Sequence, residues 1–144
     1  MLRPLALLFF AATTAFAAYA EAVPGVSGRW YMEKGTYFQY LVDRSEDGTF
    51  SASIRLPKDC SAEAADGWIE TGRWSYRDGT LYNETQTVRG EKADTSKDYY
   101  RDSFKVTIID DDRVTTYDNK TKETHEVRRV GADFKFPMKA DCAV

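Results

Sequence analysis

Gly28-Arg29-Trp30-Tyr31 opens a long series of short segments in which apolar and polar side chains alternate. The clearest segment covers residues 49–56, where apolar residues occupy every second position. Alternation with period two is typical of a strand with one buried face. Tight-turn pairs such as Asp78-Gly79 separate the segments. The chain from Gly28 onward is therefore predicted to be all-β.

Short turns between successive segments indicate an antiparallel up-and-down meander. A sheet of this kind has two unpaired edges, and closure into a barrel removes both. We therefore predict an eight-stranded antiparallel up-and-down barrel. A two-sheet β-sandwich is the alternative, which the lack of a visible long crossover connection disfavours. The expected strands cover residues 28–34, 36–43, 49–56, 67–76, 80–89, 99–109, 113–117 and 122–130.

Two segments outside these strands carry expectations of their own. Residues 90–98 are polar and charged, which predicts a flexible loop long enough to cover an end of the barrel. The tail, residues 131–144, contains Phe134 and Phe136, which we expect to cover an open end.

The first twenty residues have the three parts of a secretory signal peptide. Arg3 is the basic start, an apolar core follows, and Ala18-Tyr19-Ala20 is a small-x-small cleavage site. A membrane anchor is the alternative, but the apolar stretch is shorter than the roughly 20 residues that a span needs. The expected organisation is a signal peptide over residues 1–20 and one barrel domain over residues 21–144. Export to a periplasmic or secreted location follows, with no membrane insertion after cleavage.

Two cysteines, Cys60 and Cys142, are expected to form a disulfide, because an exported protein meets an oxidising environment. The bridge would close a loop of about 80 residues and contribute roughly 4 kcal/mol in the chain-entropy model. Two free buried thiols are the alternative. With no Cys-x-x-Cys motif and one histidine in the chain, neither a metal site nor a cofactor is expected.

The charge balance restricts the partners of the protein. Twenty basic and 23 acidic residues give a net charge of −3, with charges of both signs mixed along the chain. A mildly acidic, mixed surface does not suit nucleic acid or an anionic membrane. We expect no nucleic-acid partner.

The Gly-x-Trp opening of an all-β chain of this size resembles the lipocalin-like (calycin) barrels. In that family Gly-x-Trp closes one end of the barrel, and an arginine near the end of the last strand packs over the tryptophan. The resemblance assigns these structural roles to Gly28, Trp30 and either Arg128 or Arg129. Alternation puts Arg129 on the face of Val127 and so favours Arg129. A guanidinium over an indole contributes roughly 0.5–2 kcal/mol.

Gly-x-Trp occurs a second time in the chain, at Gly72-Arg73-Trp74. The chain departs from a typical lipocalin in one respect, since no helix is expected after the last strand. This departure points to a compact bacterial exported type or to an avidin-like barrel.

An aromatic set on the expected inner faces could line a ligand pocket or fill the barrel solid, and both readings stay open. Glu70 shares a face with two tryptophans, where it would be neutral, paired with an arginine, or an anchor for a ligand. The candidate ligand-binding residues are Tyr40, Phe50, Trp68, Glu70, Trp74 and Phe104.

Catalytic chemistry finds little support in the sequence. His125, the single histidine, lies on the face of Val127, and no nucleophile-elbow serine accompanies it. Asp110-Asp111-Asp112 reads as a solvated turn, because three adjacent carboxylates cannot all face one calcium ion. We expect no catalytic residue and no enzymatic activity.

Ligand binding is therefore the leading hypothesis, with a small apolar or amphipathic molecule held in the barrel. The alternative is a protein-binding module, such as an inhibitor of an exported enzyme, with an exported protein as its partner.

Overall fold

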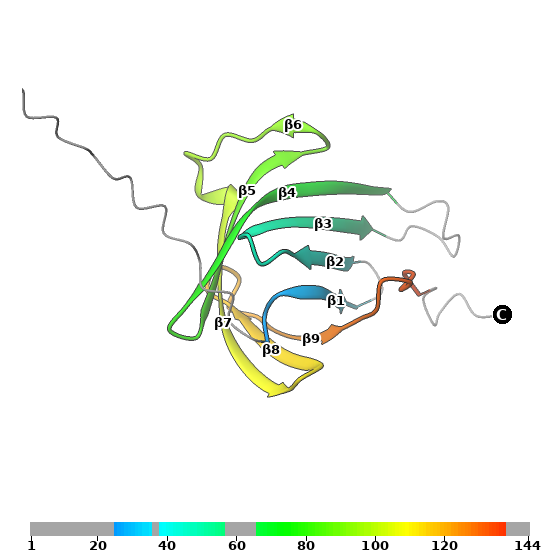
Figure 1. Ribbon diagram of the computed structural model, residues 1–144. Helices are drawn as coiled ribbons and strands as arrows, with labels where there is room; N and C mark the ends of the chain where they lie inside the picture. Colours follow the sequence, from blue (N-terminus) through cyan, green and yellow to red (C-terminus); the bar gives the residue numbers. More distant parts are fainter. Residues whose placement is uncertain (1–24, 36–37, 57–65, 138–144) are drawn as a thin grey trace, which may run out of the picture.

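The computed structural model describes residues 25–35, 38–56 and 66–137. Most of them belong to one antiparallel sheet that closes on itself (Figure 1). The strands are β1 (Gly28–Lys34), β2 (Phe38–Arg44), β3 (Thr49–Leu56), β4 (Asp66–Arg77), β5 (Thr80–Val88), β6 (Glu91–Lys92), β7 (Arg101–Asp110), β8 (Arg113–Asp118) and β9 (Thr124–Arg129), and a single turn of 3-10 helix, η1 (Asp98–Tyr100), precedes β7.

Eight strands form the barrel, and each of them pairs with the strand before it in the ring. The ring closes where β1 pairs with β9, with Trp30 opposite Arg129. The prediction of an eight-stranded up-and-down barrel is confirmed, and the sandwich alternative is wrong. Because the edges are paired, backbone groups that would otherwise be exposed are satisfied within the sheet.

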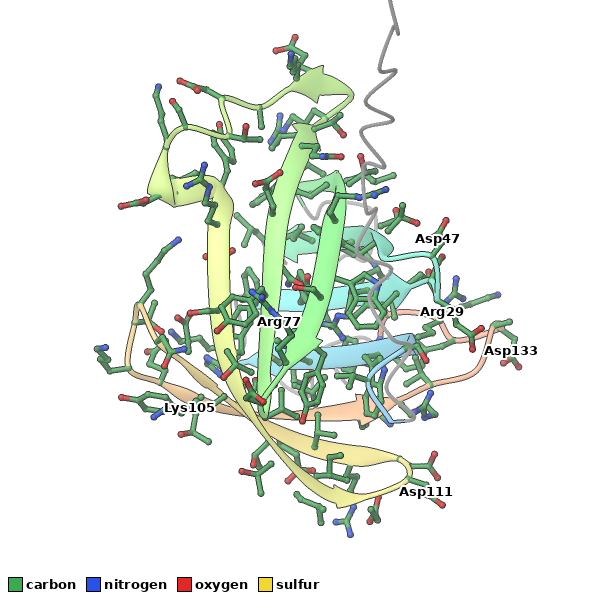
Figure 2. The ribbon with its side chains drawn as sticks, turned by 60° about the vertical axis from the view of Figure 1, so that its left-hand side comes forward. Arg29, Asp47, Arg77, Lys105, Asp111 and Asp133 are labelled. Carbon is green, nitrogen blue, oxygen red and sulfur yellow. The ribbon has the colours of Figure 1, made fainter. Side chains whose placement is uncertain are left out.

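Alternation places one side of each strand inside the barrel. In β3, Phe50, Ala52 and Ile54 are buried, whereas Ser51 is exposed. Charged side chains such as Arg77 and Lys105 lie on the outer surface (Figure 2). The interior is consequently apolar at its centre, and the outside carries the mixed charge of the sequence.

Ile108, near the end of β7, is less buried than expected. It keeps the alternation, since it lies opposite Val114 on the inner face, but 50% of it is exposed. The pairing with β8 shifts register between Ile108 and Asp110. A bulge of this kind bends the strand locally, and the side chain lies near Gly25, outside the cavity.

Residues 90–98 were expected to form a flexible loop, and part of this segment instead pairs with β5. Arg89 and Gly90 both have positive φ angles, 53° and 82°. Two successive positive φ angles make a tight hairpin turn, so β6 folds back and pairs with β5. The following residues are held by Asp94, whose carboxylate accepts hydrogen bonds from the backbone N–H and the hydroxyl of Ser96.

The part of the tail that the structure describes packs against the outer wall of the barrel, not over an end. Phe134 lies 4.8 Å from Tyr31, ring centre to ring centre. Beneath the tail Gln39 is 2% exposed, and its Nε2 donates to the Pro137 carbonyl at 2.9 Å. Tyr31 and Gln39 face outward on β1 and β2. The tail lies over both side chains and shields them from solvent.

Arg129 and Trp30 close one end of the barrel, here called the floor. The Arg129 guanidinium lies 4.3 Å from the centre of the Trp30 ring. Its Nη1 donates to the Ser27 carbonyl at 2.9 Å, and the Trp30 indole donates to the same oxygen at 3.1 Å. Gly28 leaves room for this packing, because a Cβ atom there would lie 2.6 Å from Arg129 Nη1.

Several sequence expectations lie outside the described residues. They are the signal peptide over residues 1–20 and the pairing of Cys60 with Cys142. Among the residues that are described, no helix is long and apolar enough to span a membrane.

Candidate ligand-binding cavity

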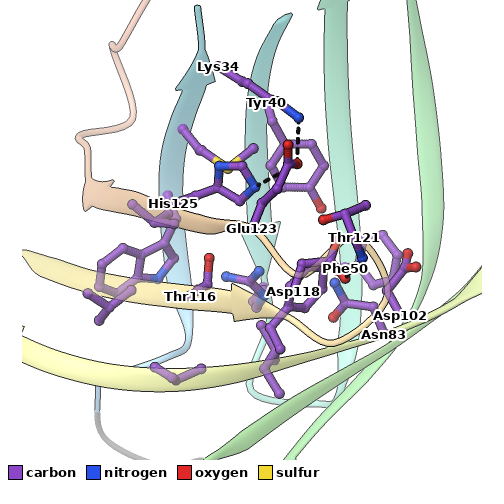
Figure 3. A pocket seen from close by; sticks show the side chains of 18 of the residues that line it. Lys34, Tyr40, Phe50, Asn83, Asp102, Thr116, Asp118, Thr121, Glu123 and His125 are labelled. Atoms are coloured by element: carbon purple, nitrogen blue, oxygen red, sulfur yellow. Dashed lines mark hydrogen bonds and ion pairs between the residues drawn. The ribbon is translucent and has the colours of Figure 1, made fainter.

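The barrel encloses a cavity of about 390 Å³. It extends from Trp30 at the floor to a group of charged and polar residues at the opposite ends of the strands, shown in Figure 3. These residues, here called the rim, are Lys34, Asp102, Asp118, Thr121 and Glu123. Binding sites for small molecules have volumes of roughly 300–1,000 Å³, so the cavity is large enough for a small ligand. The barrel is hollow.

Of the six candidate ligand-binding residues, the cavity brings five together. Tyr40, Phe50, Trp68, Glu70 and Phe104 all line it. They come from four different strands, β2, β3, β4 and β7, and the barrel curvature turns their inner faces toward one volume.

Trp74, the sixth candidate, does not line the cavity. It is 4% exposed, and its indole N–H donates to the Ser45 carbonyl at 2.9 Å. The residue shares the inner face of β4 with Trp68, but it lies farther toward the floor end. There its ring packs in the core and holds the turn between β2 and β3.

Glu70 has partners within the cavity wall. Its carboxylate accepts a hydrogen bond from the Trp68 indole at 2.8 Å and a longer one from the Thr85 hydroxyl at 3.4 Å. Of the three possibilities expected for Glu70, pairing with an arginine is not found among the described residues, and its side-chain oxygens are held by two neutral donors.

Arg44 is the cavity residue that the sequence reading missed. It was assigned to the turn after the second strand, yet β2 continues through it and pairs it with Phe50 of β3. Its side chain lines the cavity and is 9% exposed. Phe38, Tyr40, Val42 and Arg44 follow one alternation in the sequence, and extending that pattern by one step would have found it.

The guanidinium of Arg44 has no partner. None of its nitrogens makes a hydrogen bond or ion pair with another residue in the described part of the chain, and its Nε is fully buried. Burial lowers its pKa from the ordinary value, because water is withdrawn from the charged form. An arginine nevertheless stays protonated in proteins, so the cavity wall carries a positive charge.

Neutral polar groups accompany this charge. Burial raises the pKa of Tyr40 to about 12, so its hydroxyl is protonated at neutral pH. Asn83, Thr85 and Thr116 are buried and also line the cavity. The Asn83 side-chain oxygen has no hydrogen-bond partner.

The rim charges, in contrast, are satisfied locally. Lys34 forms an ion pair with Glu123, and this contact lowers the pKa of the Glu123 carboxyl. Lys120 pairs with Asp102 at 2.7 Å. The Asp118 carboxylate accepts backbone hydrogen bonds from Lys120 and Thr121 in the β8–β9 turn.

His125 lines the cavity beside the rim. Its Nε2 lies 3.8 Å from the Glu123 carboxylate, and 15% of the side chain is exposed (Figure 3). Nothing in this arrangement activates a nucleophile.

The acidic turn after β7 shows the bonding of a solvated hairpin. The Asp110 carboxylate accepts from the side chain of Arg113 and from the backbone N–H of Asp112. Within the described ranges, no three histidine, cysteine, aspartate or glutamate side chains converge as metal ligands.

No protein-family model matches this chain, and no curated protein matches it. A barrel alone does not identify a lipocalin family, so the cavity itself carries the functional argument.

Proposed function

We propose that this protein is an exported, lipocalin-like binder that holds a small apolar or amphipathic molecule inside the barrel. The observation that carries the proposal is the cavity of about 390 Å³, lined at its centre by aromatic and aliphatic side chains. Concave, largely apolar sites with a few polar groups are typical of small-molecule binding. Binding, and not catalysis, is the proposed role, because the rim carboxylates and Glu70 are held by local partners.

The protein-binding alternative has weaker support. Within the described part of the chain, the exposed large apolar side chains are Ile69, Tyr82, Tyr99, Ile108 and Ile109. They are spread over β4, β5, η1 and β7, and scattered apolar residues are normal on a protein surface.

A cavity-filling variant tests the container. Val106 lines the cavity, and its neighbour Thr107 is exposed on the outer face of the same strand. Native mass spectrometry of the protein from its producing cells first identifies any bound small molecule. Val106→Trp should reduce binding of that molecule, or of decanamide as a neutral probe, by tenfold or more, because the indole occupies the ligand volume.

Thr107→Trp is the matched control and should bind as the wild type does. Equal binding by both tryptophan variants would place the ligand outside the barrel and contradict the proposal. The same mass spectra test export. The mature chain should begin near residue 21, and its mass should be that of the oxidised form with one disulfide.

A further inference from the structure

Arg44 stands apart from the other charges around the cavity. It is nine-tenths buried and lines the cavity, yet no carboxylate of the described residues lies within ion-pair distance of it. Taking a guanidinium out of water without an anion is strongly unfavourable. Removing the partner of a buried charge is correspondingly destabilising, so an unpartnered buried arginine calls for an anion from outside the chain.

The cavity acids are not that anion. Asp102 is paired with Lys120, and Glu123 with Lys34. Glu70 is held by Trp68 and Thr85. Each of these acids thus has its own donors, and Arg44 retains its hydrogen-bonding capacity for a ligand.

The remaining surroundings of Arg44 suit a carboxylate. Tyr40 lies near enough for the Arg44 charge to act on its hydroxyl, and that hydroxyl remains protonated and able to donate. A planar guanidinium binds a carboxylate with two parallel hydrogen bonds. Phe50 and Phe104 line the same cavity and offer contact for an apolar body.

We infer that the cavity takes an amphipathic monoanion, with a carboxylate bound to Arg44 and an apolar body against the aromatic wall. This inference rests on the proposed function and names the ligand class for the same cavity. Glu70 and Asp102 also act electrostatically on Tyr40, so a second negative charge on the head group would be repelled. A single acid group is therefore favoured over a multiply charged phosphate.

Three probes with one apolar chain test the inference: decanoic acid, decanamide and decylamine. Their affinities are measured by titration calorimetry on the mature protein at neutral pH, where the acid is ionised. The wild type should bind the acid at least about tenfold more tightly than the amide. A hydrogen bond between charged groups changes an affinity by about this factor or more. Arg44→Met should bring the two affinities together, because it weakens binding of the acid more than binding of the amide.

Arg73→Met is the matched control, because Arg73 is exposed on the outer face of β4. It should retain the preference for the acid. Arg44→Lys keeps the charge without the planar fork and should retain a reduced preference, which provides a second variant if Arg44→Met does not fold.

The outcomes separate the inference from the function on which it rests. Equal affinities of acid and amide in the wild type would overturn the carboxylate assignment and leave the container standing. A preference for the acid that survives Arg44→Met would also overturn it. Failure of all three probes to bind would contradict the container, and with it the inference.

Discussion

Single residues decide how the floor of the barrel closes. Arg129 can lie over Trp30 because Gly28 has no side chain and adopts a φ angle of 98°. The arginine then donates to the Ser27 carbonyl, so one side chain both covers the indole and satisfies the backbone of the incoming chain. The two ends of the described barrel sequence are joined through this contact.

Gly28→Ala should therefore destabilise the protein by about 1–3 kcal/mol, from backbone strain at positive φ and from displacement of Arg129. Gly79→Ala is the control, because Gly79 also has positive φ (74°) but a Cβ there would meet nothing within 4 Å. Urea unfolding should show the larger loss for Gly28→Ala. Equal losses would mean that the arginine contact adds nothing beyond the backbone term.

At the scale of elements, β1 is covered on both faces. Trp30 faces the interior, whereas Tyr31 is only 2% exposed on the outer wall because the tail lies over it. The Arg128 guanidinium lies 5.2 Å from the Tyr31 ring centre and 5.4 Å from that of Phe134. The tail is thus a packed part of the fold and not a free extension.

Phe134→Ala should lower the free energy of unfolding by about 1–2 kcal/mol, because a half-buried ring and its aromatic contact are lost. Lys135→Ala changes the exposed neighbour and should have an effect within about 0.5 kcal/mol. Chemical denaturation monitored by tryptophan fluorescence measures both variants. No difference between the two would show that the tail does not stabilise the barrel in solution.

For the whole molecule, the hollow interior is an arrangement that favours binding at the expense of stability. A barrel of eight strands can be filled by its own side chains, yet this one leaves a cavity of about 390 Å³ and an unpaired buried arginine. Both features reduce the stability of the empty protein, and a ligand of the right chemistry would offset both.

Arg44→Met should consequently raise the unfolding free energy of the ligand-free protein by about 1–3 kcal/mol, because an unpaired charge is replaced by an apolar chain of similar length. Arg73→Met should leave the stability within about 0.5 kcal/mol. Thermal unfolding of protein stripped of ligand tests the pair. A lower stability of Arg44→Met would show that the guanidinium already has a favourable environment in the empty barrel.

Several parts of this structure follow from local sequence. Alternation between residues 49 and 56 predicts a strand, and the same rule places Tyr40, Phe50 and Phe104 on inner faces. The rule gave the face of Ile108, which lies opposite Val114, but not its exposure, because the residue lies at the end of the strand, outside the cavity. The second strand was also predicted to end at residue 43, one residue before Arg44. The unpaired charged group of the cavity was therefore assigned to a turn.

By itself the sequence determined the all-β class, the strand order and the faces of most strands, because these depend on neighbours along the chain. Only the tertiary structure decided that the barrel is hollow, that Trp74 belongs to the floor end and that Arg44 faces the cavity without a partner. These properties depend on distances between residues far apart in the chain. The course of the strands around the barrel sets those distances, and no local pattern records them.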